Sequence, residues 1–220
     1  MRYGIYFIPD ESTEFYKIGS KILGYDIRNR KIIALRQNSA HFFGFHATIR
    51  GIFKTSQIEC VQKDIKKICL SFEPLRLENS YLYSFNKFNR SIRFKLNRIS
   101  AKYLYELHFQ VVEVIERYRI KTYISPETRT IISSLKSREL ELLEQYGDPR
   151  VLDGYIFHFT LANRASTKEI LEIDKLINEE KEKLINKDIL VDRLSIVYQE
   201  KEDRYWKIMN EFSFERNSLV

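Results

Sequence analysis

The sequence predicts an α+β fold, organised as one bilobed domain over residues 1–220, with lobe one at about 1–99 and lobe two at about 100–220. A short His-x-Thr run occurs once in each half of the chain. A helix with a capping-box signature follows each run, and strands follow each helix. This repeated order predicts two pseudo-symmetric lobes, each with an antiparallel sheet and outer helices, around a central cleft. The prediction allows strands to be exchanged between the lobes.

The first half begins with a strand at residues 2–10 (RYGIYFIPD), which are rich in β-forming residues. Apolar residues at helical spacing then predict a helix from Phe15 to Leu23, with Gly24 as its C-terminal cap. The first His-x-Thr run is predicted to lie in a strand at about 42–53.

A capping box at Ser56–Glu59 (SQIE) predicts the next helix, which carries apolar residues on one face as far as Phe72. Two or three strands are expected after it, and the clearest is 91–97 (SIRFKLN), where apolar and polar residues alternate. These strands complete the first half.

The second half opens with a helix that Ser100 caps and that extends to about Tyr118. Residues 119–136 show no clear period and are interpreted as a loop or a lid. A short helix is expected from Ser137, with Gly147 after its last turn, and the second His-x-Thr strand at about 155–162.

The chain is then predicted to repeat the pattern of the first half. A second capping box, Ser166–Glu169 (STKE), predicts a helix to about Leu184. Two strands follow, at 189–199 (ILVDRLSIVYQ) and 204–214 (RYWKIMNEFSF), joined by the polar turn EKED.

Composition supports a globular protein with an anionic partner. Hydrophobic residues make up 44% and aromatic residues 14% of the 220 residues, which is enough for a packed core. Lys and Arg number 37 against 30 Asp and Glu, a formal net charge of +7. This charge suits a phosphate, a nucleotide or RNA, although a lysine-rich solvated surface would explain it equally well.

The cysteine pattern and the hydropathy predict a cytoplasmic protein. Cys60 and Cys69 fall in one expected helix, roughly 13 Å apart at about 1.5 Å rise per residue. A disulfide requires Cα atoms within about 7 Å, so both thiols are expected to be free. We find no signal segment and no apolar run near the ~20 residues that a membrane span needs, so no membrane association is expected.

The two His-x-Thr runs, GFHATIR and FHFTLANR, place matching polar side chains on one face of each strand. Because side chains alternate along a strand, His46 and Thr48 share one face, and His158 and Thr160 share one face of the other strand. If the alternation continues, Arg50 and Arg164 also lie on the polar faces. A single histidine in a strand is more often structural, but the repetition of the pair favours a functional site.

Two histidines across a cleft are suited to acid–base cleavage of a phosphodiester. A neutral imidazole can take a proton from the attacking water, while a protonated imidazole gives one to the departing alkoxide. Free histidine titrates near pH ~6.5, so both forms are accessible. Thr48 and Thr160 could bind the non-bridging phosphate oxygens, and Arg50 or Arg164 could offset the developing charge. The sequence does not distinguish the base from the acid.

The same residues resemble the two-histidine (2H) phosphoesterases, which have paired His-x-Thr/Ser motifs on a bilobed α+β fold. The segments RYGIYFIP, GSKILGYD, GFHATIRGIF, LKSRELELLEQYGDP, FHFTL and VDRLSIVYQ occur in the order typical of the branch associated with phosphonate metabolism. The chain departs from that branch at Arg50, where Lys is usual, and at GIF (51–53), near which Ala-Pro-Phe is usual. Arginine keeps the charge and adds bidentate geometry.

The resemblance implies a phosphodiesterase that needs no metal and no cofactor. Its expected catalytic residues are His46 and His158, and its phosphate-binding residues are Thr48 and Thr160. The expected substrate is a cyclic phosphodiester, either a 2′,3′-cyclic nucleotide or RNA end or a cyclic sugar phosphate. The expected partner is therefore a phosphate-containing small molecule, a nucleotide or an RNA end, and the protein is expected to be a monomer.

Two alternatives remain open at this point. His46 and His158 could bind a metal, but no HExxH motif or Cys/His cluster supplies further ligands. The chain could instead be a non-catalytic RNA or nucleotide-binding module that uses the same cleft, although no RNP-type motif is present. Tyr6 is a candidate to line the cleft and His41 its entrance, whereas His108 is interpreted as structural.

Overall fold

A computed structural model describes residues 1–77, 82–86, 90–95, 101–185 and 188–215 of the chain. Within them, seven strands form one antiparallel sheet in the order β11-β10-β1-β4-β8-β7-β6, and two short pairs, β2–β3 and β5–β9, lie outside it. The strands are β1 Arg2–Phe7, β2 Tyr25–Asp26, β3 Lys31–Ile32, β4 Ala47–Phe53, β5 Leu75–Leu77, β6 Leu82–Asn86, β7 Ser91–Lys95, β8 His158–Ala162, β9 Ile189–Val191, β10 Arg193–Gln199 and β11 Lys207–Ser213.

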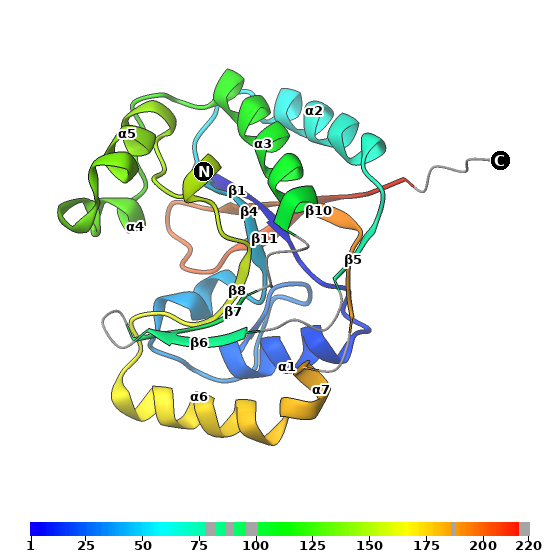
Figure 1. Cartoon of the computed structure of the whole chain (residues 1–220), viewed down its shortest axis with the longest axis vertical. Coiled ribbons are helices and arrows are strands. Elements are labelled where there is room, and N and C mark those ends of the chain that lie inside the picture. Colours follow the sequence, from blue (N-terminus) through cyan, green and yellow to red (C-terminus); the bar gives the residue numbers. More distant parts are fainter. Residues whose placement is uncertain (78–81, 87–89, 96–100, 186–187, 216–220) are drawn as a thin grey trace.

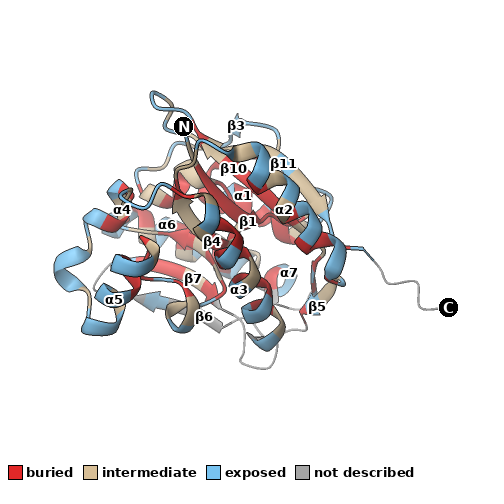
Figure 2. Ribbon diagram, turned by 90° about the horizontal axis from the view of Figure 1, so that it is seen from above, coloured by how far each residue is buried: buried red, intermediate tan, exposed pale blue. Residues whose placement is uncertain are grey.

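The helices cover the sheet from two sides of the molecule. Helices α2 and α3 pack against β10, β11 and β4, whereas α1 and α6 pack against β8, at the opposite end of the view in Figure 1. The α-helices are α1 Glu14–Leu23, α2 Ile58–Ser71, α3 Ala101–Tyr118, α4 Pro126–Arg129, α5 Ser137–Tyr146, α6 Thr167–Glu179 and α7 Lys181–Ile185, and the 3-10 helices are η1 Ser39–Phe43, η2 Ile132–Ser134 and η3 Leu152–Gly154. Figure 2 shows the buried strands between these helices. The predicted α+β class with antiparallel strands is confirmed.

The large sheet has two parts that meet at a single point. The four-stranded part β11-β10-β1-β4 and the three-stranded part β8-β7-β6 are joined where Ala47 of β4 pairs with Phe159 of β8. Each part contains strands from both halves of the chain, so strands are exchanged between them. The predicted lobe boundary near residue 99 lies outside the described residues. The junction of the two parts brings the two His-x-Thr motifs side by side.

Local signals explain most of the helix ends. Helix α1 is capped by Thr13 and ends at Gly24, which has a left-handed φ of 82°. Helix α5 begins at the predicted residue and ends before Gly147, with a φ of 69°. Both expectations are confirmed, as is the end of α3 at Tyr118. The expected cap of α3, Ser100, lies outside the described residues.

The two predicted capping boxes differ from each other. Ser166 caps α6 by accepting a hydrogen bond from the Glu169 backbone, as predicted. Ser56 does not cap α2: the N-cap residue is Gln57, whose backbone instead donates to Thr55 Oγ1. The predicted single helix to Leu184 is divided after Glu179 into α6 and α7.

Several predicted strands are shorter than expected. The strand at 42–53 begins only at Ala47, because η1 precedes it, and the strand at 155–162 begins at His158. The stretch 189–199 is divided at Asp192 into β9, which pairs with β5, and β10, which pairs with β1. Positions 96–97 of the strand predicted at 91–97 lie outside the described residues. The segment 119–136 contains α4 and η2.

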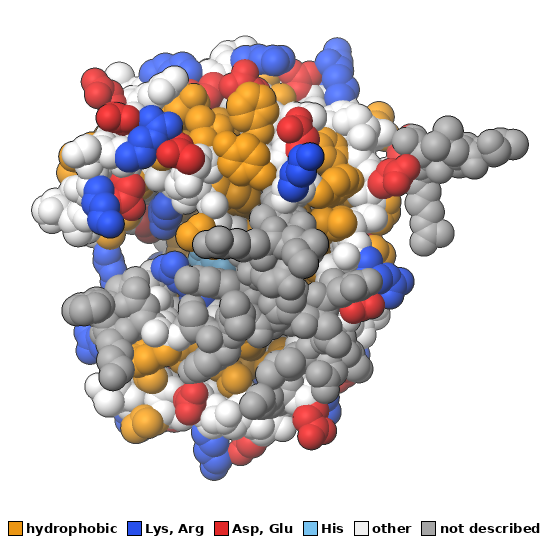
Figure 3. Space-filling model, viewed as in Figure 1, with side chains coloured by type: hydrophobic (Ala, Val, Ile, Leu, Met, Phe, Trp, Pro, Cys, Tyr) orange, Lys and Arg blue, Asp and Glu red, His pale blue; other side chains and the backbone are white. Residues whose placement is uncertain are grey.

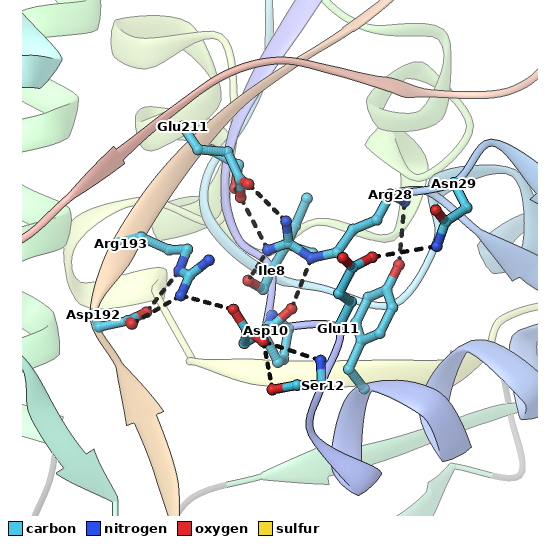
Figure 4. A network of polar contacts seen from close by, with 12 residues as sticks. Ile8, Asp10, Glu11, Ser12, Arg28, Asn29, Asp192, Arg193 and Glu211 are labelled. Atoms are coloured by element: carbon cyan, nitrogen blue, oxygen red, sulfur yellow. Dashed lines mark hydrogen bonds and ion pairs between the residues drawn. The ribbon is translucent and has the colours of Figure 1, made fainter.

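A network of charged side chains fixes the chain where it leaves β1 (Figure 4). Arg28 donates to both carboxylate oxygens of Glu211, at 2.6 and 3.0 Å, and to the carbonyl of Ile8 at 2.9 Å. Arg193 of β10 donates to Asp10 Oδ2 at 3.1 Å. Such bidentate pairs hold geometry well, so β1, which carries Tyr6, is anchored against β10 and β11.

Both cysteines are free and lie on α2, as predicted, with Cys60 exposed and Cys69 buried. None of the helices in the described ranges is both long and apolar enough to cross a bilayer.

Candidate active site

The two His-x-Thr motifs face one pocket of about 380 Å³ at the junction of β4 and β8. His46, Thr48, His158 and Thr160 all line it, together with Tyr6 of β1. The intervening residues Ala47, Phe159 and Leu161 are fully buried on the other side of the strands. The alternation predicted from the sequence therefore holds across both motifs. On the face shown in Figure 3, a histidine is visible beside Lys or Arg side chains.

Both motif histidines are held by the same local hydrogen bond. His46 Nδ1 lies 2.9 Å from the carbonyl of Gly44, and His158 Nδ1 lies 2.7 Å from the carbonyl of Ile156. Because a carbonyl can only accept, each Nδ1 carries the proton, and each neutral ring has its lone pair on Nε2. The two imidazoles therefore present equivalent nitrogen atoms for proton transfer.

Aromatic and hydroxyl groups surround the first histidine. The Tyr6 ring stacks on His46 with centroids 3.9 Å apart, and Thr48 Oγ1 lies 3.3 Å from His46 Nε2. Gly44, just before the motif, has a φ of 71°, and a Cβ there would approach Ile27 to 2.6 Å. Only glycine fits this turn without strain. Gly44 therefore fixes the position of the carbonyl that accepts the hydrogen bond from His46 Nδ1.

Helix η1, which leads into the first motif, is fixed by a residue from the second half of the chain. Asn38 caps η1 by accepting from the Ala40 backbone at 3.1 Å. The buried carboxylate of Glu169 accepts from the Gln37 backbone at 3.1 Å and from Asn38 Nδ2 at 2.8 Å. Glu169 belongs to the predicted capping box of α6, yet its side chain supports the lead-in to His46.

Cationic side chains surround the second histidine. Arg93 of β7 is the direct register partner of Thr160, and side chains of directly paired residues lie on the same face of a sheet. Arg93 lines the pocket, and its Nε is buried without a hydrogen-bond partner. Arg150 also lines the pocket. Neither arginine was among the residues predicted for the site, although the alternation in SIRFKLN places Arg93 on the polar face of its strand.

Burial lowers the pKa of both motif histidines to about 4, from an ordinary value near 6.5. For His46 burial is the largest cause. For His158 burial is again the largest cause, and the positive charge of Arg93 acts in the same direction. Burial also raises the pKa of Tyr6, so its phenol keeps its proton. In the free protein both imidazoles are therefore neutral at neutral pH.

Arg50 does not line the pocket, although regular alternation predicted it on the polar face. Its register shows why: Tyr6 pairs with Thr48, but the neighbouring Ile5 pairs with Arg50, so β4 contains one extra residue at this point. Such a bulge interrupts the alternation of side chains. The guanidinium is buried, bonds Asp148 Oδ2 at 3.2 Å and the Tyr146 carbonyl at 2.7 Å, and lies 3.6 Å from Glu116.

Arg164 is also outside the pocket lining. It follows the end of β8, where it has a φ of 56°, and its exposed side chain donates to Thr130 Oγ1 at 2.7 Å. The strand ends before the alternation reaches this residue, so the predicted face no longer applies.

His108 connects the two motifs from α3. Its Nδ1 lies 2.6 Å from the carbonyl of Ile49 in β4, and its Nε2 accepts from the Leu152 backbone at 2.8 Å. The ring stacks on Tyr155 at 3.8 Å, and the Tyr155 hydroxyl donates to the carbonyl of Thr48 at 3.1 Å. The structural interpretation of His108 is consistent with these contacts.

His41 lies outside the lining of this pocket. It is buried in η1, with Nδ1 2.8 Å from the Leu23 carbonyl and Nε2 3.0 Å from the Tyr205 hydroxyl, and it lines a second pocket. Among the described residues, no group of three or more His, Cys, Asp or Glu side chains is arranged to hold a metal ion.

Comparison with known proteins identifies a family. Residues 51–207 match the family described as "Protein of unknown function (DUF1045)". The match covers most of the chain and includes the second His-x-Thr motif, while the first motif lies just before it. A curated relative, "Ribose 1,5-bisphosphate phosphokinase PhnN" from Laribacter hongkongensis, is 24% identical over 183 residues. The match covers 77% of this chain but only 42% of the length of that relative.

Solved structures with a similar arrangement share little sequence with this chain. Escherichia coli LigT complexed with 3′-AMP has a TM-score of 0.48 and 8% identity, and the match covers 98% of both chains. Usb1 of Kluyveromyces marxianus has a TM-score of 0.42 and 13% identity, covering 89% of this chain and 92% of Usb1.

Proposed function

We propose that this chain, which belongs to the DUF1045 family, is a phosphodiesterase that hydrolyses a cyclic phosphodiester with His46 and His158 as its acid–base pair. One observation carries the proposal: both imidazoles have Nδ1 fixed by a backbone carbonyl, so both Nε2 atoms are available at one pocket. Ring opening of a cyclic diester needs one proton removed and one donated, and this pair can do both.

The charges near each ring suggest the roles. The cation of Arg93 disfavours the protonated form of His158, so His158 is assigned as the base that takes the proton from water at Nε2. His46 stacks on a neutral tyrosine ring and is assigned as the acid. It is protonated in the substrate complex, because a bound phosphate anion favours the imidazolium form.

The reaction then balances without a further reactant. The water oxygen forms a bond to phosphorus as its proton passes to His158. The ring P–O bond breaks, and its electron pair stays on the leaving oxygen, which takes the proton from His46. The Thr48 and Thr160 hydroxyls donate to the non-bridging oxygens, and Arg93, beside Thr160 in the sheet, offsets the charge that grows on them.

Among possible substrates, a cyclic sugar phosphate has specific support. The Laribacter relative is named for an activity on ribose 1,5-bisphosphate. Opening a 1,2-cyclic phosphate of ribose 5-phosphate at its 2-oxygen would produce that compound. A 2′,3′-cyclic nucleotide or an RNA end with a cyclic phosphate fits the same chemistry and stays a candidate.

The test is a comparison of wild type with His46→Ala and His158→Ala on cyclic nucleotides, cyclic-phosphate RNA ends and cyclic ribose phosphates. Loss of an acid or a base typically costs about 10²–10⁴-fold in turnover, so each variant should lose kcat by at least about 100-fold while it still binds substrate. The double variant serves as the blank. A protein that binds these compounds but turns none of them over would be the non-catalytic binding module instead.

A further inference from the structure

The pocket lining contains a second guanidinium besides the one assigned to the reacting diester, together with the carboxylates of Glu127, Glu139 and Asp148. A cyclic phosphodiester carries one negative charge, and its transition state gains about one more. The two histidines, the two threonines and Arg93 already provide protons, hydrogen bonds and one cation for that group. Arg150 is a second guanidinium lining the same pocket.

The backbone and Nε of Arg150 are held in place, while the rest of its guanidinium remains available. Its backbone donates to Asp148 Oδ1 at 3.0 Å, and its Nε is 3.4 Å from the same oxygen. Asp148 Oδ2 is bound to Arg50, so this carboxylate is shared between two guanidiniums. The Arg150 side chain is 57% exposed, which leaves the rest of its fork open to a ligand.

The other acidic groups of the lining do not cancel this charge fully. Glu127 is paired with Arg2 at 2.7 Å. Glu139 accepts from the Lys136 backbone at the start of α5; among the described residues it has no ion pair with a Lys or Arg, so its charge opposes that of one guanidinium. Arg93, in turn, has no ion pair with any carboxylate of the described residues. Two guanidiniums that face one pocket repel each other, and a second anion would relieve that repulsion.

We propose that the substrate is a cyclic phosphodiester that carries a second phosphate group, and that Arg150 binds this second phosphate. Arginine presents a planar fork that matches phosphate oxygens. The contacts of the Arg150 backbone and Nε with Asp148 limit the positions that this fork can take. The inference rests on the proposed function for the reacting group. It adds a specificity determinant: Arg150 selects for a phosphomonoester at a fixed distance from the ring that opens.

The test uses ribose 1,2-cyclic phosphate with and without a 5-phosphate. In the His46→Ala, His158→Ala double variant, binding is measured by calorimetry, independently of turnover. The 5-phosphate compound should bind about 10- to 100-fold more tightly, the factor that one or two charge-assisted hydrogen bonds give. Adding Arg150→Gln should remove this preference. Arg117→Gln, at an exposed position of α3 outside the pocket lining, controls for the same loss of net charge.

The wild-type enzyme provides the second measurement. Arg150→Gln should lower kcat/KM for the 5-phosphate compound about 10- to 100-fold more than for the compound without the 5-phosphate. Equal binding of the two compounds, or equal losses on both, would overturn the inference. If the wild type turns over neither compound but the double variant keeps the Arg150-dependent preference, the proposed function fails while the second phosphate site stands.

Discussion

The two His-x-Thr motifs have the same local design but different surroundings. In both, the imidazole Nδ1 is fixed to the carbonyl two residues earlier, and the Thr hydroxyl lies on the same face. The first motif adjoins β1, which supplies an aromatic ring. The second adjoins β7, which supplies a guanidinium. The neighbouring strands, not the motifs, therefore make the two halves of the site chemically different.

This difference shows how a duplicated motif can supply unequal partners. Acid–base chemistry needs one proton acceptor and one proton donor at the same moment, and two identical environments would favour neither arrangement. The pKa of both rings is lowered to about 4, with burial as the largest cause, but the cation of Arg93 contributes to this lowering only at His158. The asymmetry depends on what holds each motif in position, and this can be tested.

The largest expected effect is on the free energy of unfolding, and it distinguishes the two arginines that follow the motifs. Arg50 is buried against Asp148 and Glu116, and its removal takes one cation from the buried carboxylate of Asp148 and leaves Arg150 as the remaining cationic partner of that carboxylate. Arg50→Met should lower the free energy of unfolding by about 3–5 kcal/mol. Arg164→Met, at an exposed side chain with one hydrogen bond, should change it by less than about 0.5 kcal/mol. Urea denaturation of both variants measures this, and equal effects would contradict the assignment.

The bulge at Arg50 also shows where sequence reasoning reached its limit. Alternation correctly placed His46, Thr48, His158 and Thr160 in one pocket, because each pair lies within two residues and depends only on local geometry. One extra residue in β4, set by pairing with β1, then turned Arg50 away. Gly51, an isolated glycine inside the strand, is the one local sign of such a bulge, but it does not show which way Arg50 turns.

The same reasoning applies to the fold. The ends of α1 and α5 were predictable because Gly24 and Gly147 adopt left-handed conformations that favour glycine. The pairing of β7 with β8, which brings Arg93 beside Thr160, joins residues far apart in the chain. Likewise, Glu169 was recognised as part of a helix start, but its carboxylate bonds to η1 across the fold. Contacts of this kind depend on tertiary structure.

A smaller effect is expected at His108, which ties the first motif to the segment before the second. Leu152, its backbone partner, has a φ of 48°, a conformation that non-glycine residues rarely adopt without support. His108→Asn can keep the donor to Ile49, and His108→Gln can keep the acceptor for Leu152. Each variant leaves one buried partner unsatisfied and should cost about 1–3 kcal/mol of stability.

Activity separates positioning from stability at this residue. If His108 fixes the position of the first motif relative to the second, both variants should lower kcat about 10-fold at temperatures where they are fully folded. Small displacements of the proposed catalytic groups reduce the rate strongly. Val114→Ala removes buried volume from the same helix and provides a control of reduced stability. Unchanged kcat in both His108 variants would limit this residue to a structural role.

The smallest effect is a pKa difference that reports the asymmetry itself. In the folded protein both motif histidines have a pKa of about 4, against about 6.5 when unfolded. Their contribution to stability is therefore present above pH 6.5 and is lost as the pH falls towards 4. The ratio kcat/KM should rise as the pH falls from 8 towards 5, because the singly protonated pair becomes more populated.

Arg93→Gln removes a cation that lowers the pKa of His158 but is not among the causes for His46. NMR titration of the two rings should therefore show the pKa of His158 raised and that of His46 unchanged. Parallel shifts would mean that Arg93 acts on the pocket as a whole, and the distinction between base and acid would have to come from the substrate.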